Sequence, residues 1–424
     1  MSFIFNLWVF LKIKSHIFAD MIENRKISEF VSGEYVLQYQ YKSFRPNPIL
    51  YNWIVDDGDL IALLSDADRT LGSLNAYTQL VPDVDFFIRM HMAKEATTSS
   101  RIEGTQTNME EVLVKEEDIK PERRNDWIEV HNYIQAIKFS IEKLKELPIC
   151  TRLIKETHYV LMQGVRGEKK NPGEYRRSQN WIGATLRDAV YVPPHHEEIE
   201  DLMGDFEDFL HSDQINTPPL IRIGMMHYQF ETIHPFLDGN GRMGRLLITL
   251  YLVDKGLMTK PALYLSDFFE HHRTYYYDNL HRVRTHHDMT QWLKFFLVGI
   301  IETAKSSIET FKNILTLKHK IEQEVLPQFK SRQKTAMEVM NDLYRSPIIT
   351  VKDLMKSSGL NYSTANRLIN DLVELKILTV PGGSGGRTRL FLFEDYLKIF
   401  YTKPEYRKNQ AYNEIDEIED ESFR

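Results

Sequence analysis

The sequence contains almost no cysteine. Of its 424 residues only Cys150 is a cysteine, which excludes an internal disulfide and any zinc or iron–sulfur site made of several cysteines of one chain. Such a composition is typical of a reducing compartment, so we expect a cytoplasmic protein. Because Cys150 ends the apolar stretch 147–150, we expect its side chain to be buried and structural.

Long apolar runs and low-complexity segments are absent as well. Glycine (20 residues) and proline (16 residues) are too few for a collagenous chain. No stretch approaches the roughly 18 consecutive apolar residues that a membrane span needs, so we expect no membrane partner. The apolar segment 3–11 lacks the preceding positive charge of a signal peptide. We expect residues 1–20 to be a start-site artefact or a disordered extension.

The chain as a whole has no large excess of one charge. The formal net charge is −7, and 42% of the residues are hydrophobic, as in an ordinary soluble globular protein. The length predicts about three domains. Because the chain is not basic, any contact with nucleic acid must be confined to one domain.

Apolar residues recur at helical spacing along most of the chain, which predicts a mainly α fold. Two regions depart from this pattern. Residues 27–60 contain weak strand-like pieces, and residues 171–194 contain glycines and prolines around a strand-like run, which predicts a hairpin. The predicted helices cover parts of 60–114 and 126–165, and then 196–212, 219–233, 242–256, 267–283 and 290–318.

The C-terminal part changes character after about residue 328. Residues 349–378 have the order helix, glycine turn, helix, and a glycine-rich tip at 381–389 separates two β-rich runs. This order predicts a winged helix-turn-helix domain. Winged helices bind DNA or proteins, and the polar side chains that permit DNA binding here are Asn361, Ser363, Asn366, Arg367, Asn370, Arg387 and Arg389.

The densest group of reactive side chains lies between His234 and Arg245. Three glycines in this segment, Gly239, Gly241 and Gly244, have the spacing of a dinucleotide-binding loop. That motif requires a preceding strand, whereas residues 221–233 have helical periodicity. We therefore reject a dinucleotide-binding fold.

The same segment forms a consistent phosphate site without a strand. Gly239 and Gly241 let backbone amides converge as an anion nest, and the following helix adds its positive N-terminal end. Arg242 and Arg245 supply planar donors for phosphate oxygens. The alternative is a glycine-rich turn that caps a helix with surface arginines.

Two further side chains complete the chemistry. Asp238 offers hard oxygen ligands for Mg²⁺ held against phosphates. His234 has an ordinary pKa near neutrality and can accept a hydroxyl proton. A base, a metal ligand, an anion nest and two arginines within twelve residues predict phosphoryl or nucleotidyl transfer.

The segment 234–245 resembles the signature of the Fic family, His-Pro-Phe-x-(Asp/Glu)-Gly-Asn-Gly-Arg-x-x-Arg, and matches it at every defined position. The similarity extends over residues 45–300. It includes the runs 230–233, 263–266, 276–277 and 292–296, while residues 175–176, 179–183 and 192–194 resemble the hairpin flap of the family. The resemblance implies a Fic helical core with a small β-hairpin flap, here joined to a C-terminal winged helix.

This resemblance implies a protein adenylyltransferase, which transfers AMP from ATP to a Ser, Thr or Tyr hydroxyl of a target protein and releases pyrophosphate. The implied cofactors are ATP and Mg²⁺. His234 would be the base, Asp238 would hold Mg²⁺, and Arg245 would bind the γ-phosphate. The other nucleotide contacts would come from Gly239, Asn240, Gly241, Arg242 and Gly244, with Tyr277 beside the adenine.

The flap would bind the target as an added strand, through Ile182, Gly183, Ala184 and Thr185. Family members of this type often pair, so we expect a homodimer. A donor other than ATP, such as a phosphocholine donor, stays open, although the anion nest and both arginines favour ATP.

Residues 99–104 resemble the inhibitory motif of the same family, (Ser/Thr)-x-x-x-Glu-(Gly/Asn), with Ser99 and Glu103 at defined positions. A carboxylate against Arg245 would form a bidentate pair and occupy the donors meant for the γ-phosphate. A helix C-cap at Glu103 and Gly104 is the structural alternative, and both can hold. In some family members the same glutamate is thought to position water for removing AMP, so the reverse reaction is open too.

The predicted organisation has six parts. They are an N-terminal extension (1–44), an N-terminal helical region with the inhibitory helix (45–125), the Fic catalytic core (126–300), a linking helix (301–329), the winged-helix domain (330–400) and an acidic tail (401–424). Acidic ends of this kind are usually solvated.

Three adjacent histidine pairs remain, His195–His196, His271–His272 and His286–His287. Adjacent residues of a helix point about 100° apart, so we expect surface histidines rather than shared metal sites. A rival hypothesis for the whole chain is a DNA-binding transcriptional regulator whose Fic-like body is a sensor or scaffold. The complete set of groups from His234 to Arg245 favours an enzyme, because a scaffold needs no base.

Overall fold

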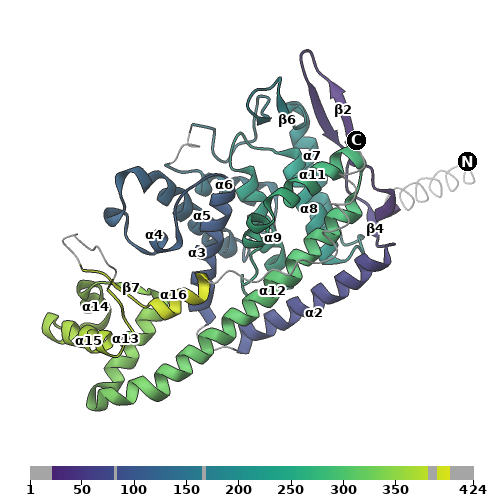
Figure 1. The fold of residues 1–424 in the computed structure, drawn as a ribbon. Helices are drawn as coiled ribbons and strands as arrows, with labels where there is room; N and C mark the ends of the chain where they lie inside the picture. The colour runs from purple at the N-terminus through teal and green to yellow at the C-terminus, as the bar shows by residue number, and fades with distance from the viewer. Residues whose placement is uncertain (1–21, 81–83, 165–168, 381–388, 402–424) are drawn as a thin grey trace, which may run out of the picture.

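The computed structural model describes residues 22–80, 84–164, 169–380 and 389–401. Residues 1–21, the tip of the predicted wing and residues 402–424 of the predicted tail lie outside the described residues. Most of the described chain is helical, as predicted (Figure 1). The helices are α2 (Gly58–Leu80), α3 (Val84–Ile102), α4 (Met109–Leu113), α5 (Arg124–Lys143), α6 (Thr151–Leu161), α7 (Ile199–His211), α8 (Pro219–Ile233), α9 (Asn240–Asp254), α10 (Ser266–His271), α11 (Arg273–His286), α12 (Met289–Lys320), α13 (Gln333–Arg345), α14 (Val351–Ser358), α15 (Tyr362–Glu374) and α16 (Glu394–Tyr401). The short strands are β1 (Asn24–Lys26), β2 (Gly33–Leu37), β3 (Lys42–Pro46), β4 (Asn52–Ile54), β5 (Ile182–Gly183), β6 (Ala189–Tyr191), β7 (Ile348–Ile349) and β8 (Phe391–Leu392).

Helix α8 lies in the core of the helical body. Nearly all of its side chains from Leu220 to Ile233 are buried, including the polar His227 and Gln229, because other helices surround α8. α9 packs against it, and α7 and α12 cover further sides. The 32-residue α12 runs beside α2 along one edge of the molecule (Figure 1). α12 is continuous across the predicted boundary between residues 300 and 301, so that boundary does not coincide with the end of an element.

One predicted helix is two helices in the structure. The run 267–283 divides into α10 and α11 at His272, whose φ of −107° and ψ of 40° are not helical. α10 packs on α3, whereas α11 packs on α12. Helical periodicity could not show this change of axis, because each half buries its own apolar residues at the same spacing.

The strands of the described residues form two-stranded pairs. β1 and β4 are parallel, and β2 and β3 form an antiparallel hairpin that projects from the body (Figure 1). β5 and β6 form the antiparallel hairpin predicted for 171–194, which we call the flap. The backbone N–H of Phe44 in β3 donates to the carbonyl of Val192 at 2.9 Å, which joins the N-terminal hairpin to the flap.

The C-terminal elements have the order expected of a winged helix. Gly359, with a left-handed φ of 69°, ends α14, and the side chain of Asn361 caps α15. β7 pairs with β8. The exposed side of α15 carries Ser363, Arg367 and Asn370. The winged-helix assignment stays a prediction, because residues 381–388 of the wing lie outside the described part of the chain.

Cys150 is not buried, contrary to the prediction. It precedes α6 as its N-cap residue and is half-buried. The residue of this stretch that enters the core is Ile149, which is 1% exposed. The chain turns into a helix at this point, so only one of the four side chains from 147 to 150 is fully buried.

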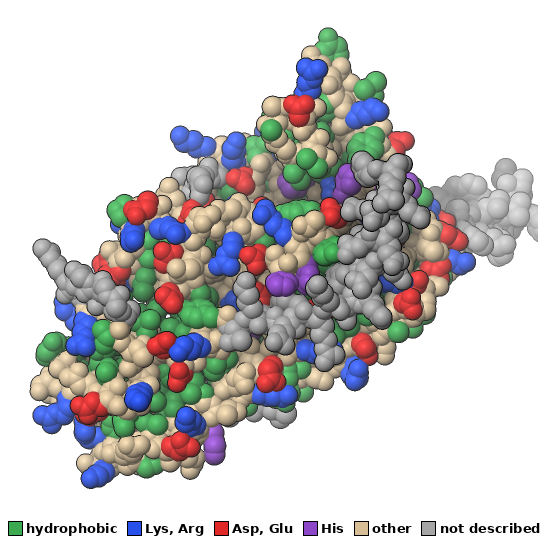
Figure 2. Space-filling view, viewed as in Figure 1, with side chains coloured by type: hydrophobic (Ala, Val, Ile, Leu, Met, Phe, Trp, Pro, Cys, Tyr) green, Lys and Arg blue, Asp and Glu red, His purple; other side chains and the backbone are tan. Residues whose placement is uncertain are grey.

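No helix in the described part of the chain is both long enough and apolar enough to cross a membrane. On the face shown in Figure 2, acidic and basic side chains are interspersed over the whole molecule, the C-terminal elements included. This mixture agrees with the small net charge of −7.

Candidate active site

The loop between α8 and α9 begins with a strained turn at His234. This residue has φ 51° and ψ 59°, a left-handed conformation that non-glycine residues rarely adopt. Arg176 holds the turn, since its Nε donates to the His234 carbonyl (3.0 Å) and its Nη2 donates to the Pro194 carbonyl (2.6 Å). Arg176 is only 2% exposed, so a buried side chain stabilises the turn.

Replacing Arg176 by alanine should therefore destabilise the fold. The change leaves the carbonyls of His234 and Pro194 without their buried donor, and each such loss costs about 1–3 kcal/mol. We expect the free energy of unfolding, measured by urea denaturation, to fall by about 2–4 kcal/mol. Arg177→Ala at the exposed neighbouring position is the control and should change it by less than about 0.5 kcal/mol. Equal losses in the two variants would contradict this role of Arg176.

The imidazole of His234 has the properties of a neutral base. Its Nδ1 lies 3.3 Å from the carbonyl oxygen of Glu231. Because a carbonyl only accepts, Nδ1 carries the proton and Nε2 keeps its lone pair. Burial and the nearby Arg176 lower the pKa of His234 to about 4. The ring is therefore neutral at physiological pH.

His158, a residue that the sequence interpretation missed, holds the turn before α9. Its Nε2 donates to the Asp238 carbonyl (2.9 Å), and its Nδ1 accepts from the N–H of Gly173 (2.9 Å). Its ring stacks on the ring of Phe236, with the two ring centroids 3.7 Å apart. Gly239, with φ 77°, lies so close that a side chain there would meet the His158 ring at 3.3 Å. A lone histidine on an amphipathic helix has no sequence signature of such a role.

Asn240 closes the loop from within. Its side-chain oxygen accepts from the Phe236 N–H, and its side-chain nitrogen donates to the Phe236 carbonyl, both at 2.8 Å. Both polar atoms of the carboxamide are thus bound to the Phe236 backbone. Asn240 could still contact the nucleotide through its backbone N–H, because the first N–H groups of α9 have no acceptors within the helix.

Two guanidinium nitrogens of Arg245 are bound by α3. Nε donates to Ser99 Oγ (2.8 Å), and Nη2 donates both to the Ser99 carbonyl (2.9 Å) and to Glu103 Oε1 (2.7 Å). The predicted bidentate pair between Glu103 and Arg245 is therefore wrong in its geometry. Ser99 lies in the last turn of α3 and Glu103 directly follows the helix, so these two residues, four positions apart, share the donors of one arginine.

Glu103 lies directly over the start of α9. A methyl group on Gly241 would overlap its carboxylate, so the missing side chain makes room for it. Burial opposes ionisation of Glu103, but the charge of Arg245, its hydrogen bond and the charge of Arg242 together outweigh burial and lower the pKa of the carboxyl. The carboxylate is therefore charged at neutral pH, and it covers both the helix start and Arg245.

α3 is also fastened to its neighbours away from Arg245. The buried carboxyl of Glu95 accepts from the hydroxyls of Tyr133 (3.0 Å) and Ser266 (2.5 Å). At the other end of the helix, Arg273 of α11 donates to the Ile102 carbonyl (3.0 Å). α3 is thus part of the helical body rather than a separate arm.

Arg242 and Asp238 occupy the other side of the loop. Arg242 is 4% exposed and lies 3.4 Å from Glu129 of α5 and 3.8 Å from Asp238. One Asp238 oxygen accepts from the Gly239 N–H at 2.6 Å, and the side chain is 45% exposed. An accessible carboxylate has the donor chemistry that Mg²⁺ prefers, so Asp238 fits the implied metal.

Glu231 is a second buried acid that the sequence interpretation missed. Burial raises the pKa of its carboxyl to about 7, with Arg245 opposing the shift and Glu103 adding to it. Its Oε1 has no hydrogen-bond partner within the described residues. A methyl group on Gly244 would overlap this oxygen, so Gly244 makes room for Glu231.

The base of the flap is tied to the same loop. Asn180 donates from Nδ2 to the Phe236 carbonyl at 2.9 Å. Within the flap, Ile182 pairs with Tyr191 and Gly183 pairs with Ala189. The residues predicted to face the target, from Ile182 to Thr185, are all exposed.

Tyr277 of α11 lies at the edge of this site. Its side chain is 40% exposed. Burial raises the pKa of its hydroxyl, and the charges of Glu103 and Arg245 both act on it. This position agrees with a residue beside the nucleotide, and its contact with adenine stays a prediction.

Comparison with known families and curated proteins yields one consistent result. The Fic/DOC family N-terminal model matches residues 61–142, and the Fic/DOC family model matches residues 148–252. The protein adenylyltransferase Fic of Aedes aegypti is 36% identical over 124 residues, which are 29% of this chain and 22% of that relative. The protein of the same name from Drosophila grimshawi is 33% identical over 135 residues, 30% of this chain and 26% of that relative. The match thus spans about a quarter of the length of these relatives.

The fold has a counterpart among solved structures. A Fic family protein from Desulfovibrio desulfuricans G20 aligns with a TM-score of 0.51 at 22% identity, over 80% of this chain and 97% of that one. The two family matches include both α3 with Glu103 and the loop from His234 to Arg245. With its mainly helical architecture and this loop, the chain is a Fic-domain protein.

Proposed function

We propose that this chain is a protein adenylyltransferase, which transfers AMP from ATP to a hydroxyl group of a target protein. One observation carries the proposal: a neutral imidazole, that of His234, lies at one end of a loop whose other end is the start of α9 with Arg242 and Arg245. The names of the relatives from Aedes and Drosophila support the same reaction.

The reaction follows from these groups. The start of α9 and Arg242 bind phosphate oxygens, and Arg245 binds the terminal phosphate once Glu103 releases it. Nε2 of His234 takes the proton of the target hydroxyl. The hydroxyl oxygen then bonds to the α-phosphorus while the bond from that phosphorus to the bridging oxygen breaks, and pyrophosphate leaves.

Labelled ATP tests this function directly. The Glu103→Gly variant, incubated with a cell lysate, should attach label to protein from ATP labelled on the α-phosphate and not from ATP labelled on the γ-phosphate. Label from the γ-phosphate alone would indicate a kinase. Label from a radioactive phosphocholine donor would identify the other alternative. No protein-bound label from any of these donors would contradict group transfer.

We infer that Asp238 holds Mg²⁺, which neutralises charge on the phosphates when it is bound. Asp238→Ala should lower the transfer rate by about 100-fold or more and should remove its response to Mg²⁺. Asp278→Ala, at an exposed position of α11, is the control and should keep both. Retained Mg²⁺ stimulation in Asp238→Ala would remove Asp238 from this role.

We also propose that α3 inhibits the reaction. Glu103 covers Gly241 and binds Arg245, and Ser99 accepts two further hydrogen bonds from that arginine. The γ-phosphate of ATP needs the same donors, so ATP is held in an unproductive pose. Release of α3 from Arg245 would be the activating step.

The surface beside the flap suits a protein target. A cavity of about 410 Å³ lies between β6 and the β2–β3 hairpin, and Tyr35, Lys42, Arg187 and Val190 are among its lining residues. Val190 is 71% exposed. An extended target segment that pairs with the flap as an additional strand would be recognised mainly through its main chain.

The lowered pKa of His234 predicts the pH dependence of transfer. The groups that act on its ring are Arg176, Glu103, Arg284 and the Glu231 carbonyl. With a pKa of about 4, the base form is complete at neutral pH and is lost only as the pH falls through 4. Rates should be measured in a Glu103→Gly/Glu231→Gln background, since the Glu231 pKa of about 7 would add its own step. A midpoint near the ordinary histidine value of about 6.5 would contradict this assignment.

The rival hypothesis of a DNA-binding regulator rests on the exposed polar side of α15. Acidic and basic side chains are interspersed over the C-terminal elements on the face in Figure 2. DNA binding therefore stays a prediction. The homodimer and the cytoplasmic location also stay predictions.

A further inference from the structure

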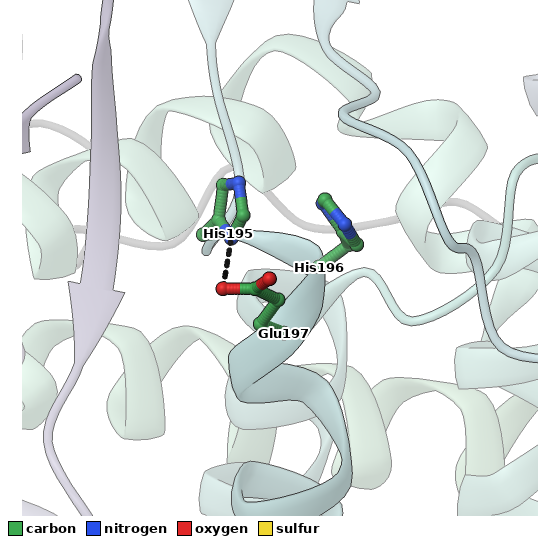
Figure 3. Close-up of side chains that lie close together, drawn as sticks. All are labelled: His195, His196 and Glu197. Carbon is green, nitrogen blue, oxygen red and sulfur yellow. Dashed lines mark ion pairs between the residues drawn. The ribbon is translucent and has the colours of Figure 1, made fainter. Parts of the chain in front are cut away.

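We propose that His195, His196 and Glu197 form a site for a divalent cation such as Zn²⁺, separate from Asp238. One ligand atom of each residue lies within 4.8 Å of the others. The three side chains lie between the end of the flap and the start of α7 (Figure 3). No second group of this kind occurs in the described ranges.

The prediction for His195 and His196 assumed that both residues lie on a helix, and the structure contradicts this assumption. His195 has φ −59° and ψ 143°, an extended conformation, and precedes the short 3-10 turn His196–Glu198. The two rings consequently lie side by side, with centroids 4.2 Å apart and planes tilted by 42°. Adjacent side chains that would diverge on a helix are thereby brought together.

The ligand atoms are available for coordination. Nδ1 of His196 is buried and has no hydrogen-bond partner within the described residues. The Glu197 side chain is 80% exposed and lies 3.6 Å from Nδ1 of His195, so its carboxylate can turn toward a cation.

The donor set selects the kind of metal. Two imidazoles and one carboxylate favour Zn²⁺ or Co²⁺, whereas Mg²⁺ prefers oxygen ligands. Ligand atoms around a tetrahedral zinc ion lie about 3.3 Å apart, so small side-chain rotations would close the site. Three protein ligands leave the fourth position to water.

A cation here would fasten the base of the flap. His195 directly follows Pro194, whose carbonyl accepts from Arg176 at 2.6 Å. Arg176 also holds the His234 carbonyl at 3.0 Å. The metal would thus brace the segment that supports the turn of the proposed base, without touching the reacting atoms.

Metal binding to the untagged full chain tests the site. In excess Mg²⁺, equilibrium dialysis should show about one Zn²⁺ per chain, and Co²⁺ should give the visible absorption of a tetrahedral site. Glu197→Gln changes an exposed side chain and leaves the fold intact, and it should weaken the affinity by at least about tenfold. The double variant His195→Ala/His196→Ala should bind no metal.

The control is a pair of histidines elsewhere in the chain. His281→Ala/His286→Ala removes two exposed histidines of α11 and should bind as the unmodified chain does. No binding at about micromolar free Zn²⁺ or Co²⁺, or equal binding by the His195→Ala/His196→Ala variant, would overturn the proposal. The experiment measures bound metal, so its result does not depend on whether the chain transfers AMP.

Discussion

Replacing Glu103 by glycine is expected to raise the rate of AMP transfer by roughly 10- to 100-fold. The change removes the carboxylate that lies 2.7 Å from Nη2 of Arg245 and clears the space over Gly241. A hydrogen bond between charged groups contributes about 1.5–3 kcal/mol. Each 1.4 kcal/mol corresponds to about a tenfold change in the equilibrium constant for the competition between Glu103 and the γ-phosphate for Arg245. This conversion gives the expected range of the increase in rate.

Initial rates with α-labelled ATP measure this effect. Glu117→Gly alters an exposed acid outside α3 and should keep the rate of the unmodified chain. Ser99→Ala should give a smaller rise than Glu103→Gly, because Arg245 keeps its bond to the Ser99 carbonyl (2.9 Å). Equal rates for Glu103→Gly and the unmodified chain would count against inhibition by α3.

Replacing His234 in the Glu103→Gly background should lower the transfer rate by about 10²- to 10⁴-fold, the usual contribution of a general base. Asparagine is the better substitution, because it tolerates the left-handed conformation at this position and cannot accept the proton at neutral pH. Affinity for ATP, measured by calorimetry, should change little, since the start of α9 and both arginines remain.

His281→Ala, on the exposed surface of α11, is the matched control for this substitution. It should keep the rate of the Glu103→Gly parent. If His234→Asn binds ATP and still transfers AMP at a rate within about tenfold of the parent, another group must accept the hydroxyl proton.

Much of the candidate site was predictable because its groups are contiguous. His234, Asp238 and Arg245 lie within twelve residues, and a turn followed by a helix brings such residues together whatever the rest of the fold does. The flap was predictable for the same reason, since glycines and prolines surround a strand-like run. The division of 267–283 at His272 was not, because periodicity does not report a change of helix axis.

The supporting residues were hidden for a different reason. Arg176 and His158 act through carbonyl groups of the loop, and any segment can supply a carbonyl. Glu231 has a shifted pKa because it is buried, and burial depends on packing. Asn240 matched the family signature, yet its carboxamide closes the loop on Phe236.

The chemical groups of the candidate site can be read from the order of amino acids, because their types and spacings within one turn and one helix are local properties. Which of these groups are free depends on the packing of distant segments. The packing of α3 brings Glu103 to Arg245 across 142 residues, and an extended residue before a short turn brings His195 to His196. Contacts of both kinds depend on how helices and loops pack in three dimensions, which neither periodicity nor composition specifies.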